Sequence, residues 1–234
     1  MPSVNRFHPD MYSPSKPDFR ALASQANLIP ITRCLLADFE TPLSAYRKIA
    51  GNGESFLFES VEGGEHLGRF SFVGCNPRAL IRQLGSQIEL VENGRVITRW
   101  TIAPAARADD PAQVRDGLEV VRRVLEQYRP VALPGLPRFT GGAIGYIGYE
   151  FIHDIEPVVP RPPRDELQTP TMCFLIADEL LIFDRVSQTI TVLVNAIVEP
   201  GADPDAAYED AVAEIERLVA LLEQPCDYSP ATVP

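Results

Sequence analysis

Two apolar runs separated by a glycine-containing turn constrain this chain more than any other sequence feature. The runs cover residues 56–58 and 70–73, and Gly63 and Gly64 lie between them. Aromatic and β-branched residues on both sides of a Gly-Gly turn are typical of paired antiparallel strands. The sequence therefore predicts a β-hairpin over residues 55–74 and a fold that contains antiparallel sheet.

Charged and polar side chains lie at the edge of this aromatic hairpin, namely Glu59, Ser60 and Arg69. A carboxylate can meet an ammonium group, a guanidinium can hold a carboxylate with two hydrogen bonds, and aromatic rings can pack an apolar side chain. The hairpin therefore has the groups needed to hold a zwitterion. The same residues also fit an ordinary hairpin in which Glu59 and Arg69 form a cross-strand ion pair on a solvated face.

The rest of the sequence predicts further antiparallel strands with a few helices outside them. Asn93-Gly94 between alternating runs is a strong hairpin signal. Strands do not alternate regularly with helices, which argues against a parallel doubly wound sheet. We predict an α+β fold that is mainly antiparallel β-sheet with a few outer helices. Strands are expected at 28–36, 79–84, 87–91, 95–101, 172–183 (interrupted at Asp178-Glu179) and 189–198, and helices at 17–23, 41–51, 110–128 and 204–222.

A second glycine-rich stretch, GGAIGYIGYE, covers residues 141–150. Its glycine spacing does not match G-x-G-x-x-G, and no strand-turn-helix context surrounds it, so it does not indicate a dinucleotide site. Glycine inside a strand indicates that another backbone or side chain approaches closely. The stretch fits a tightly packed strand, and it also fits a surface that meets another part of the protein.

The charge balance excludes several classes of partner. The formal net charge is −11 over 234 residues, whereas nucleic acids and anionic membranes are bound by clustered Lys and Arg. No apolar run approaches the ~18 residues of a membrane-spanning helix. The four cysteines have no metal or redox spacing, which favours buried thiols in a reducing compartment. We therefore expect a cytoplasmic protein that binds neither nucleic acid nor membrane.

The chain shows no motif of catalytic or metal-binding residues. His8, His66 and His153 lack a metal-spaced partner, and no serine stands in G-x-S-x-G. The paired carboxylates are explained by helix caps and hairpins rather than by acid-base chemistry. We therefore expect no catalytic residue, metal site or cofactor in this chain.

Two segments of the chain resemble a known family. ESVEGGEHLGRFSFVG at 59–74 and GGAIGYIGYE at 141–150 are similar to the two N-terminal signatures of anthranilate synthase component I, a chorismate-utilising enzyme. The resemblance covers roughly residues 28–222. It implies an N-terminal arm over 1–27, a regulatory domain of this family's N-terminal type over 28–223, and a linker over 224–234 toward a C-terminal chorismate-binding domain.

The resemblance also implies a function for the intact protein. In this family, a lyase converts chorismate and ammonia from glutamine to anthranilate and pyruvate in tryptophan biosynthesis. The C-terminal half carries the chorismate and magnesium (Mg2+) sites, so this chain alone is expected to be inactive. The N-terminal half helps to form an allosteric site at which L-tryptophan inhibits the enzyme. A glutamine amidotransferase subunit, component II, is the expected partner.

Five residues match the family's inhibitor-binding elements, and the resemblance assigns them to tryptophan: Phe58, Glu59, Ser60, Arg69 and Phe70. Glu59-Ser60 matches a Leu-Leu-Glu-Ser element that here contains Phe58 in place of the second leucine, which alters the pocket shape. Arg69-Phe70-Ser71 matches an Arg-(Tyr or Phe)-Ser element. Two alternatives stay open, namely component I of 4-amino-4-deoxychorismate synthase in folate biosynthesis and a stand-alone module that binds aromatic amino acids.

Overall fold

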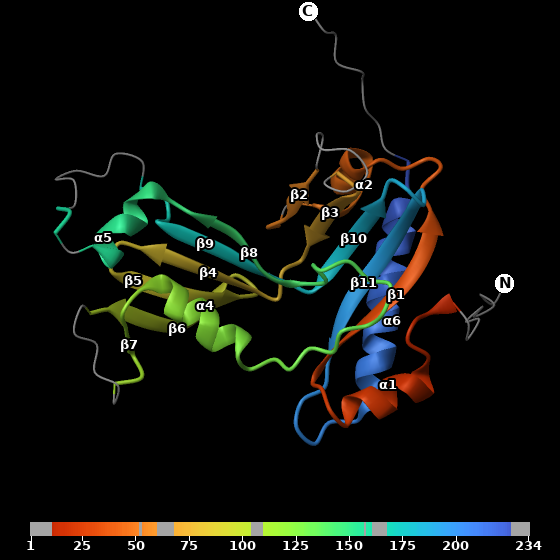
Figure 1. Cartoon of the computed structure of the whole chain (residues 1–234), viewed down its shortest axis with the longest axis horizontal. Coiled ribbons are helices and arrows are strands. Elements are labelled where there is room, and N and C mark those ends of the chain that lie inside the picture. Colours follow the sequence, from red (N-terminus) through yellow and green to blue (C-terminus); the bar gives the residue numbers. More distant parts are fainter. Residues whose placement is uncertain are drawn as a thin grey trace, which may run out of the picture. The chain divides into compact units, whose positions relative to one another are not determined.

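The chain forms two compact units, neither of which is continuous in sequence (Figure 1). The structure is a computed structural model and describes residues 11–51, 53–59, 68–103, 110–156, 158–160 and 168–225. Unit 1 comprises Met1–Asn76, Pro130–Thr140 and Asp178–Pro234, and unit 2 comprises Pro77–Arg129 and Gly141–Ala177. The predicted domain bounds of 28–223 stay a prediction.

Unit 1 is built on a five-stranded antiparallel sheet that contains the predicted hairpin. The strand order is β1 (Leu28–Leu36), β11 (Thr189–Ile197), β10 (Glu179–Asp184), β3 (Phe70–Cys75) and β2 (Phe56–Phe58). Phe58 of β2 lies opposite Phe72 of β3, which confirms the predicted pairing of these two strands. The predicted turn at Gly63-Gly64 lies outside the described residues. β1 is an edge strand, where Pro30 removes no hydrogen bond from the middle of the sheet.

Within the described residues, unit 1 contains the helices α1 (Lys16–Ala23), α2 (Pro42–Ile49) and α6 (Pro204–Leu222). The predicted start of α2 is confirmed, because the Thr41 side chain accepts a hydrogen bond of 3.1 Å from the Ser44 amide. This bond satisfies one of the amides that a helix N-terminus leaves without a partner. Gly51, with φ of 53°, follows the last turn of the helix, a conformation that glycine adopts without steric cost.

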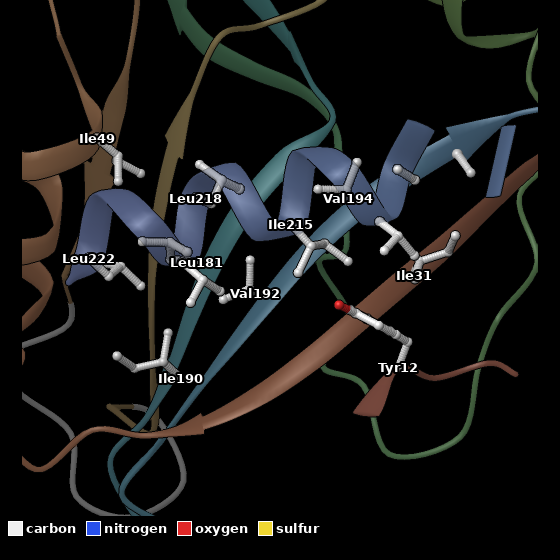
Figure 2. Close-up of a cluster of buried hydrophobic side chains, with 14 of the residues drawn as sticks. Tyr12, Ile31, Ile49, Leu181, Ile190, Val192, Val194, Ile215, Leu218 and Leu222 are labelled. Carbon is white, nitrogen blue, oxygen red and sulfur yellow. The ribbon is translucent and has the colours of Figure 1, made fainter. Parts of the chain in front are cut away.

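The core of unit 1 lies between α6 and one face of this sheet. One face of α6 is apolar and buried, and Ile215 and Leu218 are completely so. Figure 2 shows these side chains in one cluster with Leu181 of β10 and Val192 of β11. Each such side chain removed from water stabilises the fold by roughly 1.5–3 kcal/mol, so this contact holds the sheet together.

Unit 2 contains a six-stranded sheet in which all neighbours but one pair are antiparallel. The strand order is β7 (Gln113–Val114), β6 (Arg95–Ile102), β5 (Gln87–Glu92), β4 (Ala79–Leu84), β9 (Met172–Ala177) and β8 (Gly142–Ile147). Asn93 and Gly94 both have positive φ, of 49° and 72°, which confirms the predicted hairpin turn. The helical segments are α4 (Gly117–Leu125), the 3-10 helix η2 (Tyr149–Phe151) and α5 (Ile152–Ile155).

The helix predicted over 110–128 begins later and ends earlier than expected. Val114 is buried, but it belongs to strand β7, where it pairs with Ile102 of β6. The Asp116 side chain accepts a hydrogen bond of 3.0 Å from the Glu119 amide and caps α4, six residues after the predicted start at Asp110. Val114 is apolar because it is a buried strand residue, although its spacing from the apolar residues of α4 also fits a helix.

The apolar run 172–183 forms two strands in two different sheets. Its first half is β9 of unit 2, and its second half is β10 of unit 1. The interruption expected at Asp178-Glu179 is therefore the point at which the chain passes from one unit to the other. Thr189–Ile197 pairs with β10, as predicted.

The cysteines differ in their surroundings. Cys75 is buried, Cys173 is partly buried and Cys34 is exposed, so the expectation of buried thiols is wrong for Cys34. Cys34 lies on an edge strand, where a small side chain can face solvent. Cys226 lies outside the described residues.

None of the described helices is both long and apolar enough to span a membrane.

The glycine-rich segment forms β8, and one of its glycines meets a neighbouring backbone as predicted. A Cβ atom added at Gly145 would lie 1.9 Å from the carbonyl oxygen of Cys173 and 2.8 Å from the Cα atom of Phe174.

We expect Gly145→Ala to lower the free energy of unfolding by about 3 kcal/mol, because two backbones must separate to admit the methyl group. Urea denaturation measures this change.

Gly53→Ala is the matched control, because nothing lies within 4 Å of the added Cβ and φ is not positive there. This variant should match the parent or gain up to about 1 kcal/mol from the lower entropy of its unfolded chain. Equal stability of the two alanine variants would contradict a close approach of β8 to β9.

Candidate functional site

An aromatic surface covers the face of the unit 1 sheet opposite to the core. Side chains alternate between faces along a strand, and Val73 and Leu181 face the core. Their strand neighbours therefore face the other way. The aromatic surface consists of Phe56, Phe58, Phe70, Phe72 and Phe139 of the 130–140 segment.

Rings of this surface contact each other along β2, along β3, and between β3 and the 130–140 segment. Ring centroids lie 5.7 Å apart for Phe56 and Phe58, and 5.4 Å apart for Phe72 and Phe139, which meet edge to face. These separations are in the favourable range for aromatic pairs. Phe56 occupies the space over Gly74, where an added Cβ would come within 2.2 Å of its ring. The surface thus depends on a glycine in β3.

Arg69 lies at the edge of the aromatic surface with its position fixed by Asp184. Its Nε and Nη2 donate to the two carboxylate oxygens of Asp184 at 3.0 and 2.6 Å, and its guanidinium carbon lies 4.9 Å from the centre of the Phe70 ring. A bidentate pair and a stacked ring restrict a guanidinium more than a single hydrogen bond does. Arg69 is therefore preorganised.

Asp184 is itself held by the turn that joins β10 to β11. Its Oδ1 accepts hydrogen bonds from the amides of Val186 at 3.0 Å and Ser187 at 3.4 Å. Its side chain is only 13% exposed. The Arg69 guanidinium and these donors hold the pKa of the Asp184 carboxyl well below its usual range, since each favours the charged form.

Glu59 pairs with the next residue of the same turn. The Nη2 of Arg185 lies 3.0 Å from the Oε1 of Glu59, and both side chains are half-exposed. The expected cross-strand pair between Glu59 and Arg69 is therefore wrong. Each instead binds a residue of the β10–β11 turn, because the register of β10 with β3 places Asp184 opposite Phe70.

The structure thus brings four of the five predicted residues to one edge of the sheet: Phe58, Glu59, Arg69 and Phe70. Ser60 lies outside the described residues. Ser71 of the same motif points into the core instead, and its buried hydroxyl has no hydrogen-bond partner among the described residues.

Sequence reasoning missed Asp184, Arg185 and Phe139 as members of this edge. The sequence did place 184–188 in a turn between two strands, but not next to the hairpin. The pairing of β10 with β3 would have indicated both charged residues. No signal in the sequence indicated the contact of Phe139.

The described residues include no group of three or more His, Cys, Asp or Glu side chains that could hold a metal ion. The site offers an aromatic surface, the half-exposed carboxylate of Glu59 and the preorganised guanidinium of Arg69. These groups suit the binding of a zwitterion with an apolar side chain.

Comparisons with known proteins give a consistent result. The chain is 36% identical over 222 residues to anthranilate synthase component 1 of Mycobacterium bovis, covering 93% of this chain and 41% of that protein. It is 36% identical over 218 residues to the component 1 of Synechocystis sp., with coverage of 92% and 40%. The component 1 of Acetivibrio thermocellus is 32% identical over 208 residues, with coverage of 89% and 39%.

The crystal structure of anthranilate synthase component I from Streptococcus pneumoniae gives a TM-score of 0.46 at 24% identity, covering 82% of this chain and 37% of that chain. No family model matches the chain.

The fold described above is that of an α+β protein of two units, each discontinuous in sequence. The chain spans about 40% of the length of the relatives that it matches. It belongs to the anthranilate synthase component I family and corresponds to the N-terminal part of its members.

The Asp184–Arg69 pair should make stability depend on pH. We expect Asp184→Asn to lower the free energy of unfolding by about 1 kcal/mol at pH 7, a value that allows for the half-exposed Arg69. Because the folded-state pKa of Asp184 is lowered, its stabilisation is present above the unfolded-state pKa of about 3.9 and is lost as pH falls below it. Urea denaturation between pH 7 and pH 3 should show the gap between parent and variant closing on the acid side.

Asp210→Asn serves as the control, because Asp210 is an exposed residue of α6. Its effect should be within about 0.5 kcal/mol at every pH. A constant gap for Asp184→Asn down to pH 3 would contradict the pairing seen here.

Proposed function

We propose that this chain is the regulatory part of an anthranilate synthase component I and binds L-tryptophan at the edge of the aromatic surface. The observation that carries the proposal is the preorganised Arg69 beside Phe70, with Glu59 tied to the same turn. The family relation supports it, since the intact relatives are named as this enzyme.

The ligand's three parts each have a complement at this edge. The α-ammonium would meet the carboxylate of Glu59, and the indole ring would pack on Phe58 and Phe70. The α-carboxylate would bind Arg69, which has five N–H donors, of which the pair with Asp184 uses two. A residue held in place by another part of the protein loses little entropy when it binds a ligand.

In the intact protein, the bound ligand would act on a distant reaction. The part of the intact protein that this chain does not cover would convert chorismate and ammonia from glutamine to anthranilate and pyruvate. This chain alone would be inactive. Inhibition would be a coupling free energy between the two sites, since tryptophan favours one arrangement of the protein. The magnesium ion and the glutamine amidotransferase subunit concern the intact protein and stay predictions.

The alternative of a 4-amino-4-deoxychorismate synthase component has less support, because the relatives compared above are all named anthranilate synthase component 1. A stand-alone module for aromatic amino acids would share the binding site but would leave no chorismate-consuming reaction to inhibit. Inhibition assays on the intact protein distinguish the two functions.

Calorimetric titration of the chain with L-tryptophan tests the proposal. We expect selective binding over L-phenylalanine, with affinity reduced about tenfold or more by Arg69→Gln, because a charge-assisted contact to the carboxylate is lost. Ser60→Phe, which introduces a bulky ring at a predicted contact, should abolish binding. In the intact enzyme it should relieve inhibition while catalysis persists.

Arg99→Gln is the matched control, because Arg99 forms an exposed ion pair with Glu89 in unit 2. This variant should bind L-tryptophan as the parent does. Affinity that is unchanged by both Arg69→Gln and Ser60→Phe would place the ligand elsewhere and refute this site.

A further inference from the structure

We propose that Arg185 competes with the ligand for Glu59, so that an amino acid binds only when its ammonium group replaces the Arg185 guanidinium. This inference rests on the proposed binding of tryptophan at this edge. It adds a specificity-determining residue that the sequence motifs do not contain. The ligand class that it selects is an α-amino acid with a free ammonium group.

The two ion pairs at this edge differ in how firmly they are held. Arg69 and Asp184 share two hydrogen bonds, and Asp184 is nearly buried. Glu59 and Arg185 share one hydrogen bond of 3.0 Å, and their side chains are 37% and 40% exposed. Exposed single contacts contribute little to stability. The Glu59–Arg185 pair is therefore the one that opens.

Arg185 can release Glu59 without any change in the fold. Its amide donates a hydrogen bond of 3.0 Å to the carbonyl of Arg69, and its carbonyl accepts one of 2.7 Å from Nε2 of Gln188. The main chain is thus fixed on both sides, and only the long side chain moves. The exchange keeps the charge balance, because one cation replaces another beside the same carboxylate.

The exchange makes the ammonium group of the ligand the basis of discrimination. An amino acid supplies a cation that can take the place of Arg185. An analogue that keeps the indole ring and the carboxylate but lacks the amine cannot do so, and it leaves the Glu59–Arg185 pair closed. Removing the Arg185 guanidinium should therefore raise the binding affinity only of ligands that carry the amine.

Isothermal titration of the chain and of Arg185→Gln with L-tryptophan and with indole-3-propionate tests this role. We expect Arg185→Gln to bind L-tryptophan about two- to fivefold more tightly, the range that an exposed ion pair represents. The affinity for indole-3-propionate should not change. Arg122→Gln is the control for net charge, since Arg122 of α4 forms an exposed ion pair with Glu126, the residue that caps the end of this helix, and it should alter neither affinity.

A double-mutant cycle with Glu59 isolates the competition. In a Glu59→Gln background, Arg185→Gln should leave the affinity for L-tryptophan unchanged, because no carboxylate is left to compete for. A gain that persists in this background would overturn the proposed competition and assign the effect to general electrostatics.

The remaining outcomes separate the two proposals. If L-tryptophan does not bind the unaltered chain, the proposed function fails and this inference fails with it. If L-tryptophan binds but Arg185→Gln leaves its affinity unchanged, only the role of Arg185 is refuted. Weaker binding of both ligands to Arg185→Gln would show that Arg185 holds the carboxylate, which also contradicts the competition.

Discussion

The register between β3 and β10 is the constraint on which both the core of unit 1 and the candidate site depend. Leu181 opposite Val73 directs both residues toward α6, and Asp184 opposite Phe70 places the β10–β11 turn beside Arg69. A slip of one residue would turn every side chain of β10 to the opposite face. The burial of Leu181 against α6 therefore also fixes which charged residues reach Arg69.

Local signals predicted those elements whose neighbours are close in sequence. The Asn93-Gly94 hairpin needs positive φ at adjacent residues, and the stripe of α6 needs only one apolar face. The prediction for 172–183 did not show that this run divides between two sheets, because its composition is equally apolar on both sides of Asp178. Composition shows that a segment is buried, but it does not show which of two sheets buries it. Only the pairing of β9 with β8 and β10 with β11 does that.

The sequence indicated four residues of the candidate edge, but not their ion-pair partners. Glu59 and Arg69 were found because they border a short hairpin, where local pairing is the natural expectation. Their partners lie 126 and 115 positions away in the chain. A charge bound to a close neighbour and one bound to a distant turn look the same in a sequence. The distinction matters for the proposed function, because Asp184 holds Arg69 with two hydrogen bonds, whereas Arg185 holds Glu59 with one.

A binding edge that carries opposite charges beside aromatic rings has conflicting requirements. Without a ligand, a carboxylate and a guanidinium next to apolar rings lose part of their hydration, which costs free energy unless other charges compensate. Oppositely charged side chains of the protein supply this compensation, but each of them reduces the free energy that would be gained on binding a ligand. The β10–β11 turn meets both requirements in different ways at its two residues. Asp184 uses one edge of the Arg69 guanidinium and orients the rest of it, whereas Arg185 covers Glu59 with a single exchangeable bond. The charges of the edge are thus compensated without a ligand, and in the proposed exchange binding would break only the weaker pair.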